Sequence, residues 1–467
     1  MSTQRSERWQ QLLSWHRLGS TRPPTGSAED RTDYDRDYDR IVFSSAFRRL
    51  HDKTQVFPLS TRDYTPRTRL THSIEASCVG RTLGQKAGRA LLKQGVRVDP
   101  SHLGTLVAAG CLAHDIGNPP FGHSGEAAIQ HWAEQRLAPW TPEPSAKKSP
   151  FATQAEWQDL VKFEGNAQGF RILSRLQSRE RQGGLRYTVA TVGAMSKYPR
   201  PSVIPSGRER DKSRVSEKKF GYFQEDAALA RDAFQKLGLL EREPDVFARH
   251  PLAFLVEAAD DICYAVIDLE DSAMLGLIPH EQACALLEGL MVKREPSSPS
   301  EELQPESLLG VLRSGSIGAL VNECVDVFSE AVQQMEQGTW EKSLVAARDG
   351  MNSQLEEIKR ITRQKGYESE RVLQIESAGF KTLGGLLEMF APAVMTDSPN
   401  KEEKKLRQLL PFEFLQRPGP LLQERGEAIA RLTPYQRLLC VTDYISGMTD
   451  GFAVELFQRL SGIKLPS

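Results

Sequence analysis

The stretch that decides the fold is CLAHDIGNPPFGHSGE, residues 111–126. An apolar run leads directly into His114 and Asp115, and a Gly-Asn-Pro-Pro turn signal separates them from His123 and Glu126. Proline cannot continue a helix and restricts the residue before it, so the pattern predicts a helix end, a sharp turn and a second helix. Adjacent helical residues point about 100° apart, so His114 and Asp115 can share one ion only near that helix end.

Helical periodicity extends outward from this stretch. Residues 101–116 carry apolar side chains at three- and four-residue spacing, with Ser101 as the expected N-cap. Residues 72–92 show a similar stripe, made of Ile74, Cys78, Leu83, Ala87 and Leu91. Residues 250–275 are long and apolar, which predicts a buried helix.

Strand signals are scarce, and the best short candidate is GLRYTVATVGAM, residues 184–195. We therefore predict an all-α, predominantly helical fold with at most minor short strands. Proline, serine and lysine enrichment predicts irregular segments at 138–150, 197–219 and 293–307. The expected organisation is a polar N-terminal segment (1–34), a catalytic core (35–280) and a C-terminal helical region (281–467) that packs on the core and helps to complete the substrate pocket.

Composition bounds the function. The 467 residues include 60 basic and 61 acidic side chains, so a globally basic nucleic-acid binder is disfavoured. The six cysteines form no C-x-x-C pair, which favours a reducing compartment over a disulfide framework. No signal peptide and no apolar run of the roughly 18 residues needed for a membrane span are recognised. The sequence predicts a soluble, cytoplasmic protein without membrane partners.

The His114-Asp115 pair is uninformative alone, but further polar residues indicate a candidate metal site. His72 opens its own amphipathic segment, and Asp260 lies in an otherwise apolar helix, where an aspartate is rarely buried unless it is paired or metal-bound. Two histidines and two aspartates suit Mn²⁺, Fe²⁺, Co²⁺, Ni²⁺ or Zn²⁺, with Mg²⁺ less favoured. Asp260, Tyr264 and Asp268 share one helix face, for which a hydrogen-bonded structural network is the alternative explanation.

The order His72, His114-Asp115, Asp260 resembles the H…HD…D signature of HD-domain metal-dependent phosphohydrolases. Longer strings resemble the deoxyguanosinetriphosphate triphosphohydrolase (dGTPase) branch, from about residue 35 to about residue 460. They are FRRLHDKTQVFPL, TRLTHSIEAS, AHDIGNPPFGHSGE, FEGNAQG, EAADDICYAVIDLED and DYISGMTDGFA. One departure is Gly451 after Asp450, where a basic residue is expected.

The resemblance implies hydrolysis of a deoxynucleoside triphosphate between the 5′-oxygen and the α-phosphorus, giving a deoxynucleoside and tripolyphosphate. It implies one divalent metal per site, Mg²⁺, Mn²⁺ or Co²⁺, held by His72, His114, Asp115 and Asp260. His123 is the expected general acid or base, and Glu126 is expected to orient it.

The resemblance and the spacing also suggest substrate contacts. Arg69, one turn before His72, is expected on a phosphate, and Gln55 and Asp268 on the sugar 3′-hydroxyl. Tyr264 is expected to pack under the deoxyribose and to crowd a 2′-hydroxyl. The remaining candidates are Asn118, Asn166, Lys197 and Tyr198.

Two other functions stay open at this point. A different HD phosphohydrolase would share the metal ligands, and a nucleotide- or DNA-sensing regulator would use the basic 197–219 segment. The resemblance further implies a homo-oligomer, a hexamer, and single-stranded DNA as an effector. Base preference among the dNTPs is undetermined, and the absence of a G-x-x-x-x-G-K-[ST] sequence argues against a P-loop.

Overall fold

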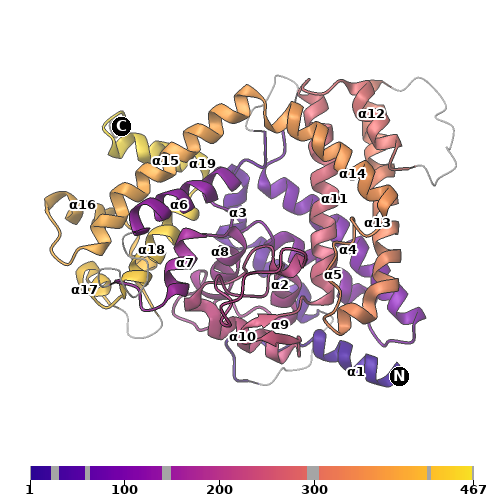
Figure 1. Ribbon diagram of the computed structural model, residues 1–467, viewed down its shortest axis with the longest axis horizontal. Helices are drawn as coiled ribbons and strands as arrows, with labels where there is room; N and C mark the ends of the chain where they lie inside the picture. Colours follow the sequence, from indigo (N-terminus) through magenta and orange to yellow (C-terminus); the bar gives the residue numbers. More distant parts are fainter. Residues whose placement is uncertain are drawn as a thin grey trace.

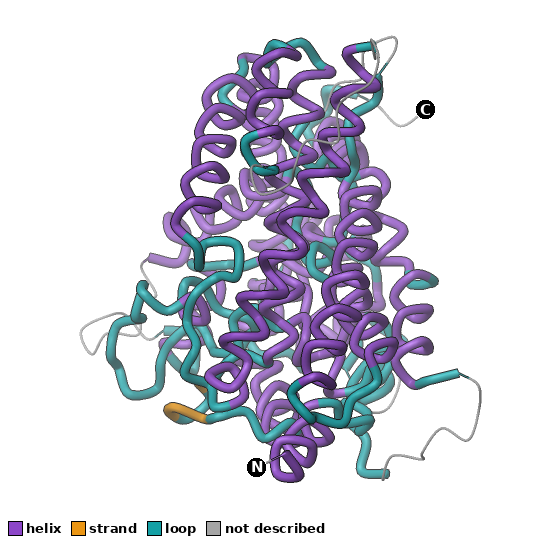
Figure 2. Tube along the Cα trace, turned by 90° about the vertical axis from the view of Figure 1, so that its right-hand side faces the viewer, coloured by secondary structure: helices purple, strands orange, loops and turns teal. Residues whose placement is uncertain are grey.

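The computed structural model describes residues 2–22, 31–57, 64–138, 149–291, 304–417 and 422–464. The predicted all-α class is confirmed: helices dominate, and the strands of the described ranges form one small antiparallel pair. Figure 1 shows the helices packed around one another, with the long helix α15 lying alongside α6. In Figure 2 the strand pair lies at the edge of the helical body.

The elements follow in chain order. The helices are α1 (Ser2–Leu12), α2 (Asp33–Val42), α3 (Ser45–Arg48), α4 (Arg69–Lys93), α5 (Pro100–Ala113), α6 (Gly122–Leu137), α7 (Gln154–Val161), α8 (Gly165–Arg171), α9 (Val189–Met195), α10 (Ala227–Lys236), α11 (Pro251–Met274), α12 (His280–Glu288), α13 (Pro305–Glu336), α14 (Asp349–Thr362), α15 (Glu370–Met395), α16 (Lys401–Leu409), α17 (Arg425–Ala430), α18 (Pro434–Ser446) and α19 (Asp450–Leu460). The strands are β1 (Glu241–Glu243) and β2 (Val246–Phe247), and short 3₁₀ or π turns occupy Arg49–Asp52, Ile172–Leu176, Val215–Glu217, Gln224–Asp226, Arg363–Tyr367 and Phe412–Leu415.

The three expected long helices are present as α4, α5 and α11, but two local predictions on them were wrong. Asp99, rather than Ser101, caps α5: its carboxylate accepts the Ser101 N–H at 2.8 Å, and Pro100 occupies the first turn. On α4, Ile74 and Cys78 are exposed.

The buried face of α4 is instead the one with small residues. A side chain on Gly84 would collide with the backbone at Leu103, and one on Gly88 would collide with Pro100. Helices α4 and α5 therefore approach each other closely along the glycines of α4. A search for large apolar residues does not detect this glycine-lined face. Larger residues such as Val79 and Leu83 then fill the rim of the contact.

The strand prediction for 184–195 was also wrong, because residues 189–195 form α9. Thr188 caps this helix by accepting the Thr191 N–H at 3.2 Å. Every α9 residue from Val189 to Ala194 is buried, so burial on all sides, rather than alternation, explains the apolar pattern. The observed β1–β2 pair was not predicted.

Of the predicted irregular segments, 197–219 is described and is irregular apart from the Val215–Glu217 turn. Most of 138–150 and 293–307 lies outside the described residues. Within 197–219, Arg208 and Arg214 both form ion pairs with the buried Glu217. Much of the basic charge is thus used inside the fold.

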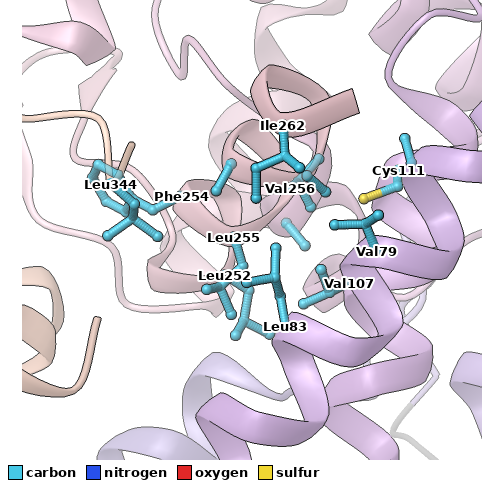
Figure 3. Packing of buried hydrophobic residues seen from close by; sticks show 14 of the residues in the cluster. Val79, Leu83, Val107, Cys111, Leu252, Phe254, Leu255, Val256, Ile262 and Leu344 are labelled. Atoms are coloured by element: carbon cyan, nitrogen blue, oxygen red, sulfur yellow. The ribbon is translucent and has the colours of Figure 1, made fainter. Parts of the chain in front are cut away.

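Buried apolar residues form two separate clusters. The first core combines α4, α5, α9, α11 and α13 and includes Trp9 and Leu12 of α1. Figure 3 shows its centre, where Val79 and Leu83 of α4, Val107 and Cys111 of α5, and Leu255 and Ile262 of α11 gather. Burial of this kind contributes about 25 cal/mol per Å² of apolar surface, enough to fix these helices relative to one another.

The second core joins α6 and α7 to α15, α18 and α19. Trp132 of α6, Leu386 of α15 and Ile445 of α18 belong to it. The predicted division at 34/35 and 280/281 remains a prediction, and the packing groups residues differently: α1 and α13 share the first core, whereas α6 shares the second. The turn between α5 and α6 therefore connects the two cores.

One helix meets a length-and-composition test for a membrane span. Residues 307–336 of α13 reach a mean hydropathy of 1.2 over their most apolar window, a third of which is buried in the fold. Core helices of globular proteins pass the same test, so this is weak evidence for a span. The cytoplasmic location remains a prediction.

Candidate active site

Three helices of the first core bring the predicted metal ligands together. His72 lies in the first turn of α4, His114 at the end of α5, and Asp260 in the middle of α11. Asp260 Oδ1 is 3.3 Å from His72 Nε2 and 3.4 Å from His114 Nε2. Ligand atoms bound to one ion at about 2.1 Å lie roughly 3.0 to 3.4 Å apart in octahedral or tetrahedral geometry. The three side chains are therefore spaced as ligands of a single cation.

The orientation of His114 supports a metal ligand role. Its Nδ1 lies 2.6 Å from the carbonyl oxygen of Cys111, to which it donates, so Nε2 is the ring nitrogen that faces the site and is available to a metal when unprotonated. Nε2 is buried and has no hydrogen-bond partner among the described residues. A buried polar atom without a partner is costly, and a cation between these groups would satisfy it. The residues present thus fit a divalent metal.

Asp115 borders this cluster and is strongly held. Its Oδ1 lies 3.5 Å from His114 Nε2 and accepts Asn118 Nδ2 at 2.6 Å, while Oδ2 accepts Arg69 Nη1 at 2.7 Å. Burial opposes the charge on Asp115, but the cationic form of His114 and the Arg69 guanidinium lower its pKa to about 2. Arg69 and Asn118, predicted on substrate, therefore hold Asp115, a predicted metal ligand that lies outside the group formed by His72, His114 and Asp260.

The charge balance of the cluster favours a cation. Burial by itself disfavours the His114 imidazolium, yet Asp115 and Asp260 raise the pKa of His114 to about 9. The two carboxylates thus draw a positive charge into the site, either a proton or a metal. A divalent ion that binds the imidazole nitrogen would displace that proton, which makes metal affinity pH-dependent.

A cavity of about 380 Å³ opens beside the cluster. This volume lies within the range of roughly 300–1,000 Å³ typical of small-molecule sites. The predicted site residues that line it are Gln55, Arg69, His114, Asp115, Asn118, His123, Glu126, Asn166, Lys197, Tyr198, Asp260 and Tyr264. Two predicted residues, His72 and Asp268, are buried and lie outside this lining.

His123 and Glu126 begin α6, as the sequence predicted, but their partners differ from expectation. The Glu126 carboxylate accepts the Gly165 N–H at 2.8 Å and lies 3.5 Å from Lys219 Nζ. Within the described residues no hydrogen bond joins Glu126 to His123. The orienting role of Glu126 stays a prediction, and in the structure the Gly165 backbone holds its carboxylate.

The imidazole of His123 is open to the cavity and electrostatically perturbed. Partial desolvation, followed by the charges of Lys219 and Arg69, lowers the pKa of His123 below its usual value, while Asp115 and Glu164 act in the opposite direction. The ring is therefore neutral at neutral pH and is able to accept a proton.

Lys219 joins two carboxylates beside His123. Its Nζ lies 2.9 Å from Glu164 Oε1, and Glu164 also accepts Asn166 Nδ2 at 2.8 Å. Burial and the nearby Glu126 raise the pKa of Glu164. Glu164 was not singled out from the sequence, although it lies in the quoted string FEGNAQG, where an acid among small residues is a usable signal.

The far end of the cavity is an aromatic and amide wall. Tyr264 and Tyr367 face each other with ring centroids 5.8 Å apart, and Tyr367 donates its hydroxyl to Asp268 Oδ2 at 2.6 Å. Burial raises the pKa of Asp268 to about 7. The side-chain oxygen of Gln55 is buried without a partner. Tyr367 was missed from the sequence because only the fold brings the π turn before α15 beside α11.

Lys197 lies close to the metal cluster. Its Nζ is 3.5 Å from Glu257 Oε1 and 3.7 Å from Asp260 Oδ2, and burial is outweighed by these carboxylates, so its pKa is raised. Arg249 bonds Glu257 at 2.6 Å and stacks over the Tyr198 ring at 5.6 Å. Lys197 is a fixed cation at the cavity wall.

Glycines bring two motif segments into backbone contact. A side chain on Gly117 would collide with the carbonyl oxygen of Gly165 and the amide nitrogen of Gly169. The 111–126 turn thus lies directly against the start of α8. This contact places Glu126 within reach of the Gly165 N–H.

A helical fold in which two histidines and an aspartate from three helices converge beside a His-Asp turn defines an HD-domain phosphohydrolase. Consistent with this class, residues 69–147 match the HD domain and residues 392–459 match the phosphohydrolase-associated domain. The chain belongs to the deoxyguanosinetriphosphate triphosphohydrolase family, as the motifs predicted. Membership supports hydrolase activity and divalent metal binding.

Three relatives illustrate the similarity. The chain is 40% identical to a deoxyguanosinetriphosphate triphosphohydrolase-like protein of Synechocystis, over 98% of this chain and the whole of the relative. It is 38% identical to a protein of the same description from Pseudomonas aeruginosa, with the same coverage. It is 30% identical to the deoxyguanosinetriphosphate triphosphohydrolase of Salmonella arizonae, over 97% of this chain and 98% of the relative.

Proposed function

We propose that the protein hydrolyses deoxynucleoside triphosphates, dGTP among them, to a deoxynucleoside and tripolyphosphate. The observation that carries the proposal is the shared cavity: the metal cluster, His123 and the Tyr264 wall line one space of nucleotide size. Relatives at 30–40% identity over the full chain support the same reaction class.

His72, His114, Asp115 and Asp260 would hold the metal, which we propose to be a single Mg²⁺, Mn²⁺ or Co²⁺. When bound, it supplies Lewis-acid stabilisation of charge on a phosphoryl oxygen. Arg69 and Lys197 add fixed positive charge to the cavity wall beside Asp115 and Asp260. Both are held by carboxylates, so they are oriented before a triphosphate arrives.

His123 exchanges the proton in this proposal. Its neutral ring, set against the cations Lys219 and Arg69, is able to accept a proton at its free ring nitrogen. A bound triphosphate would offset those cations and make the imidazole more basic as the reaction proceeds. Glu126 acts by fixing the start of α8 and holding Lys219, rather than by a direct bond to His123.

The Tyr264 wall provides the preference for deoxyribose. Tyr264 and Tyr367 form a packed pair that would crowd a 2′-hydroxyl, and Gln55 offers an unpaired oxygen to a 3′-hydroxyl. Crowding of one added hydroxyl supports a moderate preference for deoxyribose. Asp268 contributes through Tyr367 in the free protein, and Asn118 and Asn166 line the cavity as further polar contacts.

The deciding experiment incubates the protein with each of the four dNTPs and GTP, separately with Mg²⁺, Mn²⁺ and Co²⁺, and resolves the products. Tripolyphosphate and deoxynucleoside in equal amounts support the proposal. Pyrophosphate or orthophosphate as the first product would contradict it and would favour a different HD phosphohydrolase.

Assembly as a homo-oligomer, a hexamer, and activation by single-stranded DNA are also proposals that rest on family resemblance. The alternative of a nucleotide- or DNA-sensing regulator draws on the basic segment 197–219, whose Arg208 and Arg214 pair with Glu217 inside the protein. Because these arginines pair within the protein, the hypothesis of a DNA-sensing regulator has less support than the hypothesis of a hydrolase.

A further inference from the structure

Lys53 and Asp450 connect the second core to the segments that carry Gln55 and His123. Lys53 is only 3% exposed and lies two residues before Gln55, and Asp450 is the half-buried first residue of α19. Neither belongs to the metal cluster, and neither touches the proton-exchanging ring of His123. Both side chains bond backbone groups of segments that are distant in the sequence.

Lys53 bonds two carbonyl groups from distant parts of the chain. Its Nζ donates to the Asn118 carbonyl at 2.6 Å and to the Ser446 carbonyl at 2.8 Å. Its own carbonyl accepts the Arg69 N–H at 3.0 Å, at the start of α4. The lysine thus ties the end of α18 to the turn after Asp115.

Asp450 makes the complementary set of bonds. One carboxylate oxygen accepts the Thr54 N–H and the other accepts the Phe121 N–H, each at 3.0 Å. Thr54 precedes Gln55, and Phe121 lies two residues before His123. The aspartate therefore holds both substrate-facing segments from the α19 side.

The Phe121 end of this arrangement is strained. Phe121 has a φ of 62°, a left-handed conformation that is unfavourable for a bulky residue. A strained backbone persists only where its surroundings impose it, and the charge-assisted bond from Asp450 is one such restraint. Loss of the bond should let the start of α6 relax and should move His123.

We propose that Lys53 and Asp450 form a polar clamp, a pair of positioning residues through which the phosphohydrolase-associated region holds the turns bearing Gln55 and His123 in register with the metal cluster. Only the predicted effect of the clamp on kcat rests on the proposed function; its hydrogen bonds do not. Its bonds cross from the loop that follows Leu50 of the first core to α18 and α19 of the second.

The test compares Asp450→Ala with Thr449→Ala as a matched control. Thr449 caps α19 by accepting the Phe452 N–H, so its loss weakens the same helix without touching either turn. We expect Asp450→Ala to lower kcat about 10- to 100-fold with a smaller change in KM, because charge-assisted hydrogen bonds and catalytic alignment are worth that much. Asp450→Asn, which retains one acceptor oxygen, should lie between Asp450→Ala and wild type.

Amide hydrogen exchange gives a readout that does not depend on activity. The Thr54 and Phe121 amides should exchange faster in Asp450→Ala than in Thr449→Ala, while the Leu103 amide, bonded to the Asp99 carbonyl at the start of α5, serves as an internal reference. If the wild type releases no tripolyphosphate but this exchange difference appears, the proposed reaction fails and the clamp stands. Equal exchange and equal kcat in the two variants would overturn the clamp.

Discussion

The two hydrophobic cores contribute differently to the cavity. The first core supplies the candidate metal ligands from the long helices α4, α5 and α11. Buried apolar side chains packed between these helices fix the positions of the ligands. The second core supplies the helix that carries His123, and it fixes that helix through backbone contacts and the Lys53–Asp450 clamp. Metal binding is thus expected to tolerate disturbance of the second core, whereas turnover is not.

The largest expected effect comes from the first core. Asp260→Ala removes the carboxylate that both imidazoles face, and we expect loss of the metal and a fall in kcat of at least about 10³-fold, since a metal contributes several kcal/mol to charge stabilisation. Metal content and tripolyphosphate release are the measurements. The neighbouring Asp261→Asn is the control and should retain the metal; an active Asp260→Ala would refute the ligand assignment.

His123→Ala tests the second core and should separate the two cores most clearly. We expect kcat to fall about 10²- to 10⁴-fold with metal affinity unchanged, which is the usual contribution of general acid-base catalysis. If His123 accepts the proton, wild-type kcat/KM should fall as the pH drops through its lowered pKa, below the ordinary histidine value of about 6.5. If kcat/KM instead falls as the pH rises through this region, His123 acts as a general acid.

Gly117→Ala perturbs the contact between the turn and α8. The added methyl group meets backbone atoms of Gly165 and Gly169, which cannot rotate away as a side chain would. We expect a loss of about 3 kcal/mol in the free energy of unfolding, the upper end of typical overpacking costs. Urea unfolding measures it, and Gly426→Ala, with open space around the new methyl, should differ little from wild type.

Tyr264→Ala should have the smallest effect, confined to sugar discrimination. Opening the wall removes the packing that disfavours a 2′-hydroxyl, so the ratio of kcat/KM for GTP over dGTP should rise about 10-fold, within the range known for pocket contacts. Competition assays with the two nucleotides measure it. An unchanged ratio would place the discrimination elsewhere, with Tyr367 as the next residue to change.

The sequence predicted the first core's contribution better than the second's. Helical periodicity and the placement of acids on apolar segments located His72, His114 and Asp260 because each signal lies within one helix. The glycine face of α4 was misread, since small residues pack closely without an apolar stripe.

Contacts between distant segments were the ones not predicted. Tyr367 meets Asp268 across 99 positions, and Lys53 meets Ser446 across 393. Periodicity reports which face of a helix is buried, but it does not report which helices meet. The expected His123–Glu126 bond illustrates the same limit, because the competing Gly165 amide arrives from another helix.

The contact of Gly117 with Gly165 and Gly169 has a practical consequence for protein engineering. The two segments meet main chain to main chain at these glycines, so neither can accept a replacement taken from an unrelated scaffold unless its counterpart is transferred with it. A designer who grafts this catalytic turn elsewhere must therefore move residues 111–126 and 163–169 as one unit.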